Sequence, residues 1–264
     1  MVAEKLSAAE ISRYITDSSV RVEYIDCVDS TNTALKQRAE NGESEGLLLV
    51  ASEQTAGRGR LGRSFSSQKG SGVYFSILLR PDLNPADSLL ITTCAAVSAA
   101  KAIETVSCKK TAIKWVNDIY MNDRKVAGIL TEASFDIKKG KLAYAVLGIG
   151  INICFDSVPD EIKDIADSVF TKDDIFPDAA AQIVAQTVNN FMAEYRMLTQ
   201  KRFMPFYKEH DYLENQPIKV IKPSSERDAV AKGIDDDFRL LVEYDDGSEE
   251  YLSSGEVSAK RKES

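Results

Sequence analysis

Residues 54–80 read QTAGRGRLGRSFSSQKGSGVYFSILLR, and this stretch decides how the chain is interpreted. It contains no Asp or Glu, although the whole chain carries a net charge of −8. Its cations are Arg58, Arg60, Arg63, Lys69 and Arg80. It also holds five of the chain's fourteen glycines: Gly57, Gly59, Gly62, Gly70 and Gly72. Glycine lets backbone N–H groups approach a bound oxygen, and arginine offers a planar fork of donors. The stretch therefore predicts a mobile loop that clamps an anion.

The neighbours of this loop are strands. Residues 46–52 form a short apolar run, and residues 73–79 form another. A Walker loop is excluded because its Gly-x-x-x-x-Gly-Lys-Ser/Thr spacing is absent, and a Rossmann fingerprint is excluded because a strand, not a helix, follows the glycines. The alternative is a solvated glycine-arginine loop or an RNA-binding tail, although such a tail is normally longer, repetitive and terminal, whereas this loop joins two strands.

The rest of the chain predicts an α+β fold with a mixed, largely antiparallel sheet and flanking helices. Helices are expected at 33–40, 87–106, 178–198 and 202–213, and strands at 21–28, 111–116, 119–121, 125–135 and 142–154. Beyond residue 217 short strands alternate with turns, which indicates a small β-barrel. We expect a first domain at 1–214 and a second at 215–264.

Composition excludes several classes of protein. The chain has 41 acidic and 33 basic residues, and this excess of negative charge disfavours broad binding to DNA or an anionic membrane. No apolar run near 20 residues and no signal-like N-terminus are evident, so a cytoplasmic location is expected. The spacing of the cysteines fits no Cys-x-x-Cys motif, and we interpret them as small core residues: Cys27, Cys94, Cys108 and Cys154. The single histidine, His210, lies at an expected helix end and is not expected to be catalytic.

Further motifs in fixed order carry a resemblance to a known family. They are GRGRLGR at 57–63, KWVND at 114–118 with RKVAGIL at 124–130, and GIGIN at 148–152. Together they resemble biotin protein ligase (biotin–[acetyl-CoA-carboxylase] ligase), and the similarity covers nearly the whole chain. The resemblance implies a class II synthetase-like biotin/lipoate ligase domain and an SH3-like C-terminal barrel. Val116 stands where the family's motif has proline, which leaves the rigidity of that turn in question.

The resemblance implies a two-step reaction. Biotin and ATP, with Mg²⁺, give biotinyl-5'-AMP, and a lysine of a biotin carboxyl carrier protein domain then takes the biotin. About 20 residues precede the first strand, so the form of the family without an N-terminal DNA-binding domain is expected, with no DNA or membrane partner. A homodimer through a sheet edge is left open.

The resemblance also implies roles for individual residues. Lys125, Arg60 and Arg58 match the catalytic cations. The biotin contacts are expected to be these three with Ser30, Thr31, Asn32, Gln54, Gly57, Gly128, Gly148 and Gly150. The ATP contacts are expected to be the same three cations with Arg63, Phe65, Lys114, Asn117 and Asn152. Asn117 and Asp118 are candidate metal contacts, and Asp118 could instead orient Lys125.

Each role has a structural alternative. Ser30 and Asn32 are also good helix caps, Phe65 could pack on the core, and the glycines could mark bulges. Lys125 could be a solubilising strand-edge lysine, and Asn117 and Asp118 could shape a turn.

Two other functions compete with biotin ligation. Lipoate protein ligase shares the fold, although the GRGRLGR and KWVND pair favours biotin. A non-catalytic sensor of biotin or nucleotide would bind without turnover. The motifs contain no cysteine, which disfavours a thioester intermediate of the octanoyltransferase type.

Overall fold

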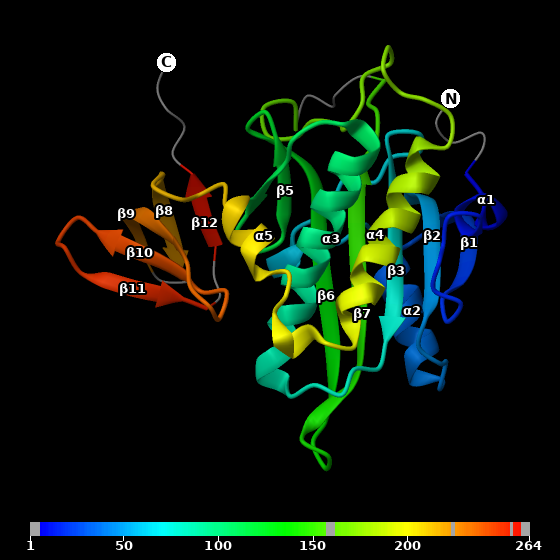
Figure 1. The fold of residues 1–264 in the computed structure, drawn as a ribbon, viewed down its shortest axis with the longest axis horizontal. Coiled ribbons are helices and arrows are strands. Elements are labelled where there is room, and N and C mark those ends of the chain that lie inside the picture. The colour runs from blue at the N-terminus through cyan, green and yellow to red at the C-terminus, as the bar shows by residue number, and fades with distance from the viewer. Residues whose placement is uncertain (1–5, 157–161, 223–224, 254–255, 260–264) are drawn as a thin grey trace.

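The computed structural model describes residues 6–156, 162–222, 225–253 and 256–259. Its main feature is a seven-stranded sheet in the order β1-β2-β3-β7-β6-β5-β4 (Figure 1). β1 and β2 are parallel, and every other neighbouring pair is antiparallel. The strands are β1 (Arg21–Val28), β2 (Leu47–Gln54), β3 (Gly72–Leu79), β4 (Ala112–Lys114), β5 (Asp118–Met121), β6 (Arg124–Asp136) and β7 (Lys141–Asn152).

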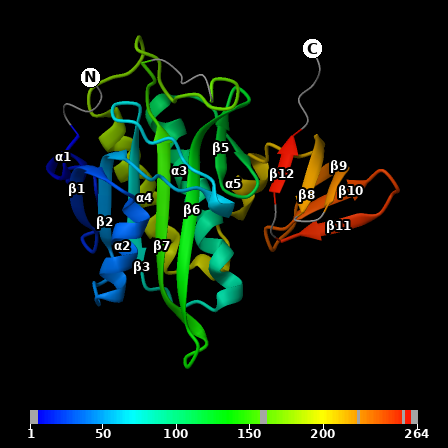
Figure 2. The same ribbon diagram turned by 180° about the vertical axis from the view of Figure 1, so that it is seen from behind.

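Helices lie on both faces of this sheet. Long α3 (Leu89–Ser107) and α4 (Ala179–Tyr195) pack together over one face (Figure 1), and α2 (Thr31–Glu40) covers the other (Figure 2). The apolar side chains of β3 and β7 are almost all buried between these layers. Two short helices complete these layers: α1 (Ala8–Ser12) packs against β1 and α4, and α5 (Met204–Glu209) packs against α3. Within the described residues, 3₁₀ turns lie at Arg60–Gly62, Pro85–Ser88 and Leu198–Gln200.

The helical stretch Pro85–Ser107 is long and apolar enough to cross a membrane by length and composition alone. The sequence has no uninterrupted apolar run of that length, because polar residues such as Lys101 and Glu104 interrupt this stretch. However, 72% of its most apolar window is buried inside the protein, as expected for a core helix.

The C-terminal residues form a separate, fully antiparallel sheet in the order β11-β10-β9-β8-β12. Its strands are β8 (Pro217–Lys222), β9 (Ser225–Ile234), β10 (Leu240–Tyr244), β11 (Glu249–Leu252) and β12 (Glu256–Ala259). Phe238 joins it to the first sheet: its carbonyl accepts a hydrogen bond from Trp115 Nε1 at 2.8 Å, and its ring stacks on Phe203 at 5.4 Å. The predicted fold class is therefore confirmed.

Several local predictions need correction. α2 begins at Thr31, two residues earlier than expected, because the Ser30 hydroxyl caps it by accepting from the Thr33 N–H. The helix expected at 202–213 is short, since α5 ends at Glu209. Cys94 and Cys154 are buried as predicted, whereas Cys27 and Cys108 are exposed. Cys108 terminates α3 in a left-handed conformation with φ 57°.

Candidate active site

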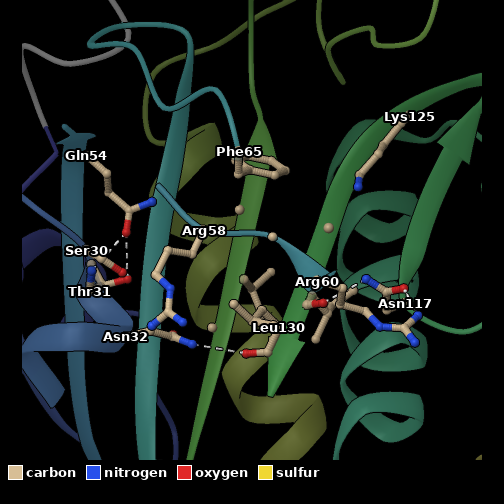
Figure 3. Close-up of a pocket in the computed structure, with 16 residues that line it drawn as sticks. Ser30, Thr31, Asn32, Gln54, Arg58, Arg60, Phe65, Asn117, Lys125 and Leu130 are labelled. Carbon is tan, nitrogen blue, oxygen red and sulfur yellow. Dashed lines mark hydrogen bonds between the residues drawn. The ribbon is translucent and has the colours of Figure 1, made fainter. Parts of the chain in front are cut away.

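A pocket opens on the face of the large sheet that carries α2, beneath the glycine-arginine loop (Figure 3). The sheet register builds its floor. Gly128 of β6 pairs with Gly150 of β7, and Leu130 pairs with Gly148. Alternate residues of a strand point to the same face. The three glycines therefore lack side chains on one face of the sheet and leave a depression there. The pocket is lined by Ser30, Thr31, Asn32, Gln54, Arg58, Gly59, Arg60, Phe65, Asn117, Lys125, Gly128, Ile129, Leu130, Gly148, Ile149 and Gly150.

The loop above this floor is closed by its own backbone. Gly59 N–H donates to the Arg63 carbonyl at 2.7 Å, and Phe65 N–H donates to the Gly57 carbonyl at 3.0 Å. A side chain on Gly57 would lie 2.4 Å from the Phe65 carbonyl oxygen, so the loop requires glycine there. Gly62 turns the chain with φ 76°, a conformation that glycine adopts readily.

Phe65 occupies the floor. A Cβ on Gly150 would lie 2.6 Å from the Phe65 ring, and one on Gly128 would lie 3.2 Å from it. The ring also meets Tyr74 edge-on, with centroids 6.3 Å apart. Because this side chain and the loop arginines fill the depression, the remaining cavity is about 50 Å³, little more than the volume of a water molecule or two.

Lys125 reaches the pocket from the start of β6. Its ammonium nitrogen lies 2.7 Å from Asp118 Oδ1 and 5.7 Å from the centre of the Phe65 ring. The Lys125 backbone bonds on both sides, to the Ile165 carbonyl and the Asp167 N–H. Asn152, behind it, donates to the Asp167 carbonyl at 2.9 Å. A fixed backbone therefore presents this amine over Gly128.

Asn117 holds the second cation. Its side-chain NH₂ donates to the Ile129 carbonyl at 2.8 Å, which leaves its oxygen to accept from Arg60 Nη1 at 2.9 Å. The peptide bond between Trp115 and Val116, just before it, is cis. The turn after β5 places Asn122 and Asp123 in the left-handed region, at φ 48° and 61°.

The opposite wall is a buried polar group at the start of α2. Ser30, Thr31 and Asn32 are each less than 5% exposed. Gln54 Oε1 accepts from the Thr31 N–H at 2.8 Å, and Ser76 Oγ bonds to Asn32 Oδ1 at 2.6 Å. Polar groups this well paired make a rigid wall with fixed donors and acceptors.

Most of the predicted site residues therefore gather in one place. Twelve of them line the pocket, and five are not among its lining residues: Gly57, Arg63, Lys114, Asp118 and Asn152. Lys114 lies instead over the Tyr120 ring, 5.4 Å from its centre. His210 stacks on Phe206 and meets Glu104, outside the pocket lining.

Sequence reasoning missed two polar residues that touch this wall, Ser76 and Glu132. Ser76 interrupts the apolar run of β3, which was a signal, whereas Glu132 lies in the more polar second half of β6 and gave none. Glu132 follows Leu130 on the same face of β6 and bonds to Asn32 Nδ2 at 3.0 Å.

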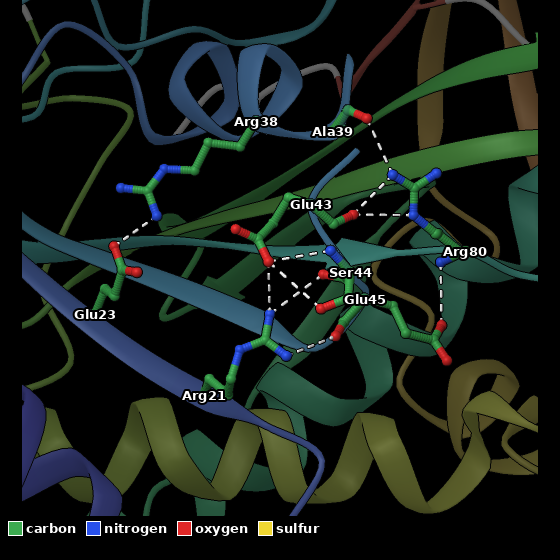
Figure 4. Close-up of polar contacts among 8 residues, drawn as sticks. All are labelled: Arg21, Glu23, Arg38, Ala39, Glu43, Ser44, Glu45 and Arg80. Carbon is green, nitrogen blue, oxygen red and sulfur yellow. Dashed lines mark hydrogen bonds and ion pairs between the residues drawn. The ribbon is translucent and has the colours of Figure 1, made fainter. Parts of the chain in front are cut away.

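Arg80 does not belong to the clamp. It lies beyond the opposite end of β3 and bonds to backbone carbonyls of Ala39 and Glu43 (Figure 4). It also bonds to the Ala143 carbonyl. The charge pattern grouped it with the loop because it counts residues and not positions in space.

The fold and the pocket define a class, a biotin/lipoate ligase domain followed by a small antiparallel sheet. The sequence profile of the Biotin/lipoate A/B protein ligase family matches residues 24–152. That of the Biotin protein ligase C terminal domain matches residues 215–260.

Known relatives define the family more closely. The bifunctional ligase/repressor BirA of Bacillus spizizenii is 33% identical over 95% of this chain and 78% of its own length. The biotin–[acetyl-CoA-carboxylase] ligase of Mycobacterium tuberculosis is 27% identical over 86% of this chain and 85% of its own. The Aquifex aeolicus biotin protein ligase in complex with biotin and ATP superposes with TM-score 0.73 at 29% identity, covering 91% of this chain and 99% of that one. The chain belongs to the biotin protein ligase family, and it is a ligase.

Proposed function

We propose that this protein activates biotin with ATP and transfers the biotinyl group to a lysine of a biotin carboxyl carrier domain. The observation that carries the proposal is that three cations, Arg58, Arg60 and Lys125, meet at one pocket whose floor is made of glycine. A carboxylate and a phosphate repel each other, and cations fixed between them cancel that repulsion. The acetyl-CoA carboxylase named for the M. tuberculosis relative supports a carboxylase carrier domain as acceptor.

In the first step a carboxylate oxygen of biotin attacks the α-phosphorus of ATP, and pyrophosphate leaves. We assign Lys125 to the junction of the two anions, because its backbone is fixed and its amine faces the loop. Arg60 lies in the same region, and its hydrogen bond to the Asn117 side chain orients its guanidinium group. In the second step the acceptor lysine attacks the acyl carbon, and AMP leaves.

The ligands divide the pocket between them in this proposal. The ureido head of biotin would meet the polar wall of Ser30, Thr31, Asn32 and Gln54, which can supply fixed hydrogen bonds in a dry space. Phe65 offers a flat apolar face for adenine and would have to leave the floor to do so. Ligand entry therefore requires the loop to move.

Mg²⁺ fits one corner of the site. Asp118 Oδ1 is buried and, within the described residues, pairs with Lys125 by charge without an aligned hydrogen bond. The described residues contain no cluster of three His, Cys, Asp or Glu side chains that could hold a metal alone. Mg²⁺ commonly binds one or two carboxylates together with phosphate oxygens and water. Asp118 with the Asn117 side chain would hold it, and the ion would neutralise charge on the pyrophosphate.

Mass spectrometry of a carrier domain tests the proposal. The domain is incubated with the full chain, biotin, ATP and Mg²⁺, and one biotinyl group is expected on one lysine. A lipoyl carrier domain offered with lipoate is the matched control and should stay unmodified. Ligand binding without any adenylate would favour the sensor function, and lipoylation would favour lipoate ligation.

A further inference from the structure

Glu132 is an acidic side chain in direct contact with the polar wall of the pocket. It lies on β6, on the same face as Gly128 and Leu130, and its side chain is 17% exposed. Three side chains converge on its carboxylate: Asn32 Nδ2 at 3.0 Å, Lys36 Nζ at 3.1 Å and Arg58 Nη1 at 3.1 Å. One carboxylate thus touches both the wall and the loop.

This carboxylate sets the direction of the hydrogen bonds in the wall. An ionised carboxylate only accepts, so Asn32 turns its NH₂ toward Glu132 and toward the Leu130 carbonyl. Asn32 Oδ1 then accepts from the Ser76 hydroxyl at 2.6 Å. A hydroxyl has one proton to give, so with Ser76 committed to Asn32, the Thr31 hydroxyl donates to Ser76 Oγ at 2.7 Å.

A backbone group orients the far side of the wall. Gln54 Oε1 accepts from the Thr31 N–H at 2.8 Å. Gln54 therefore turns its NH₂ group the other way, where Nε2 donates to Ser67 Oγ at 3.0 Å and faces the pocket (Figure 3). A ureido carbonyl needs donors, and this orientation supplies one.

The carboxylate stays charged at neutral pH. Burial acts against the charge, but the hydrogen bonds from Asn32 and Lys36 and the charge of Arg58 outweigh it and hold the pKa of Glu132 below its ordinary value. As an acceptor without a proton, Glu132 fixes the orientation of Asn32 more firmly than a neutral amide could.

We propose that Glu132 is a positioning residue for biotin: it orients Asn32 directly, and the Ser76 and Thr31 hydroxyls through Asn32, so that the wall presents one fixed arrangement of donors and acceptors to the ureido group. This rests on the proposed activation of biotin. Glutamine at 132 could either donate or accept, which would allow both orientations of Asn32. The loss would therefore fall on biotin binding and leave ATP binding unchanged.

Steady-state adenylate formation by the full chain tests this. Pyrophosphate release is measured against biotin at saturating ATP, and against ATP at saturating biotin. For Glu132→Gln we expect the KM for biotin to rise about tenfold, since one hydrogen bond to a charged group is worth about that factor. The kcat should stay within about threefold, and the KM for ATP should not change. Glu132→Asp, which keeps the charge, should give a smaller rise.

Glu23→Gln is the matched control, because Glu23 pairs with Arg38 of α2 outside the pocket. It should behave as wild type, and a Glu132→Gln that matched it, or that lowered kcat alone, would overturn the proposal. If Glu132→Gln does not fold, Glu132→Asp decides: a raised KM for biotin alone supports the role, and unchanged or jointly raised values refute it. Failure of the wild type to form adenylate would instead refute the proposed function, before any variant is compared.

Discussion

Arginine is used in opposite ways at the two ends of β3. At the far end Arg80 donates to three backbone carbonyls, two of them at the end of α2 and in the turn that follows it (Figure 4). At the near end Arg58 bonds to the Glu132 side chain, and Arg60 bonds to the Asn117 side chain. The three residues come from one charged stretch of sequence, yet their partners differ in kind.

The difference in partners explains the difference in role. Backbone carbonyls are held by helix and sheet, so Arg80 has partners that cannot move away and becomes part of the fold. A side-chain partner can be exchanged for a ligand anion, since the guanidinium keeps its donors and only changes the acceptor. Arg58 and Arg60 are therefore ready to bind an anion, whereas Arg80 is already satisfied.

Replacement of Lys125 should give the largest effect at the near end. In Lys125→Ala we expect the rate of adenylate formation to fall about 100-fold, because a fixed charge at the reacting groups is worth about 3 kcal/mol. The melting temperature should change little, since the ion pair with Asp118 is partly exposed. Pyrophosphate release and thermal unfolding measure the two quantities.

Lys141→Ala is the control for this variant. Lys141 also begins a strand and also pairs with an aspartate, Asp82, but it lies at the far end of the sheet. Its removal should leave adenylation unchanged. A Lys125→Ala protein with wild-type turnover would remove Lys125 from the reaction.

The two arginine environments predict opposite results for one kind of substitution. Arg60→Ala should lower kcat/KM for adenylate formation about tenfold and leave the free energy of unfolding nearly unchanged. Arg80→Ala should lower the free energy of unfolding by about 1–2 kcal/mol, because several backbone carbonyls lose their hydrogen-bond donor. Its kcat/KM for adenylate formation should stay unchanged. Urea unfolding and initial rates on both variants make the test. If the losses were exchanged, the distinction between the two ends would be wrong.

Much of the fold could be predicted from the sequence because its strands are long and clearly patterned. β1 was expected at the residues where it occurs, since residues 21–28 alternate in the manner of a strand and cap residues follow at 29–32. Helix bounds were harder, because capping and packing decide them: α5 ends early where the chain turns toward the C-terminal sheet. The domain boundary near residue 215 stays a prediction.

The pocket could be predicted only where residues sit in motifs. Gly128 and Gly150 were recognised separately, and the register that pairs them was not available from the sequence. Glu132 and Ser76 carry no motif, and their importance depends on what lies across the sheet. The error over Arg80 has the same origin, because an eight-residue strand separates two places by about 26 Å.

The smallest predicted effect is a change in how fast trypsin cleaves the glycine-arginine loop. The cavity of about 50 Å³ cannot hold biotin, so Phe65 and the loop arginines must move out before a ligand enters. Few backbone hydrogen bonds oppose that opening, and trypsin should cut the ligand-free protein after Arg58, Arg60 or Arg63. Biotin with ATP should slow this cleavage several-fold, because bound anions give the guanidinium groups new partners. The bond after Lys101, within helix α3, serves as internal control and should resist trypsin in both conditions because helical backbone must unfold before cleavage. Equal cleavage of the loop with and without ligands would mean that its arginines do not exchange partners, and the contrast with Arg80 would then lack a functional basis.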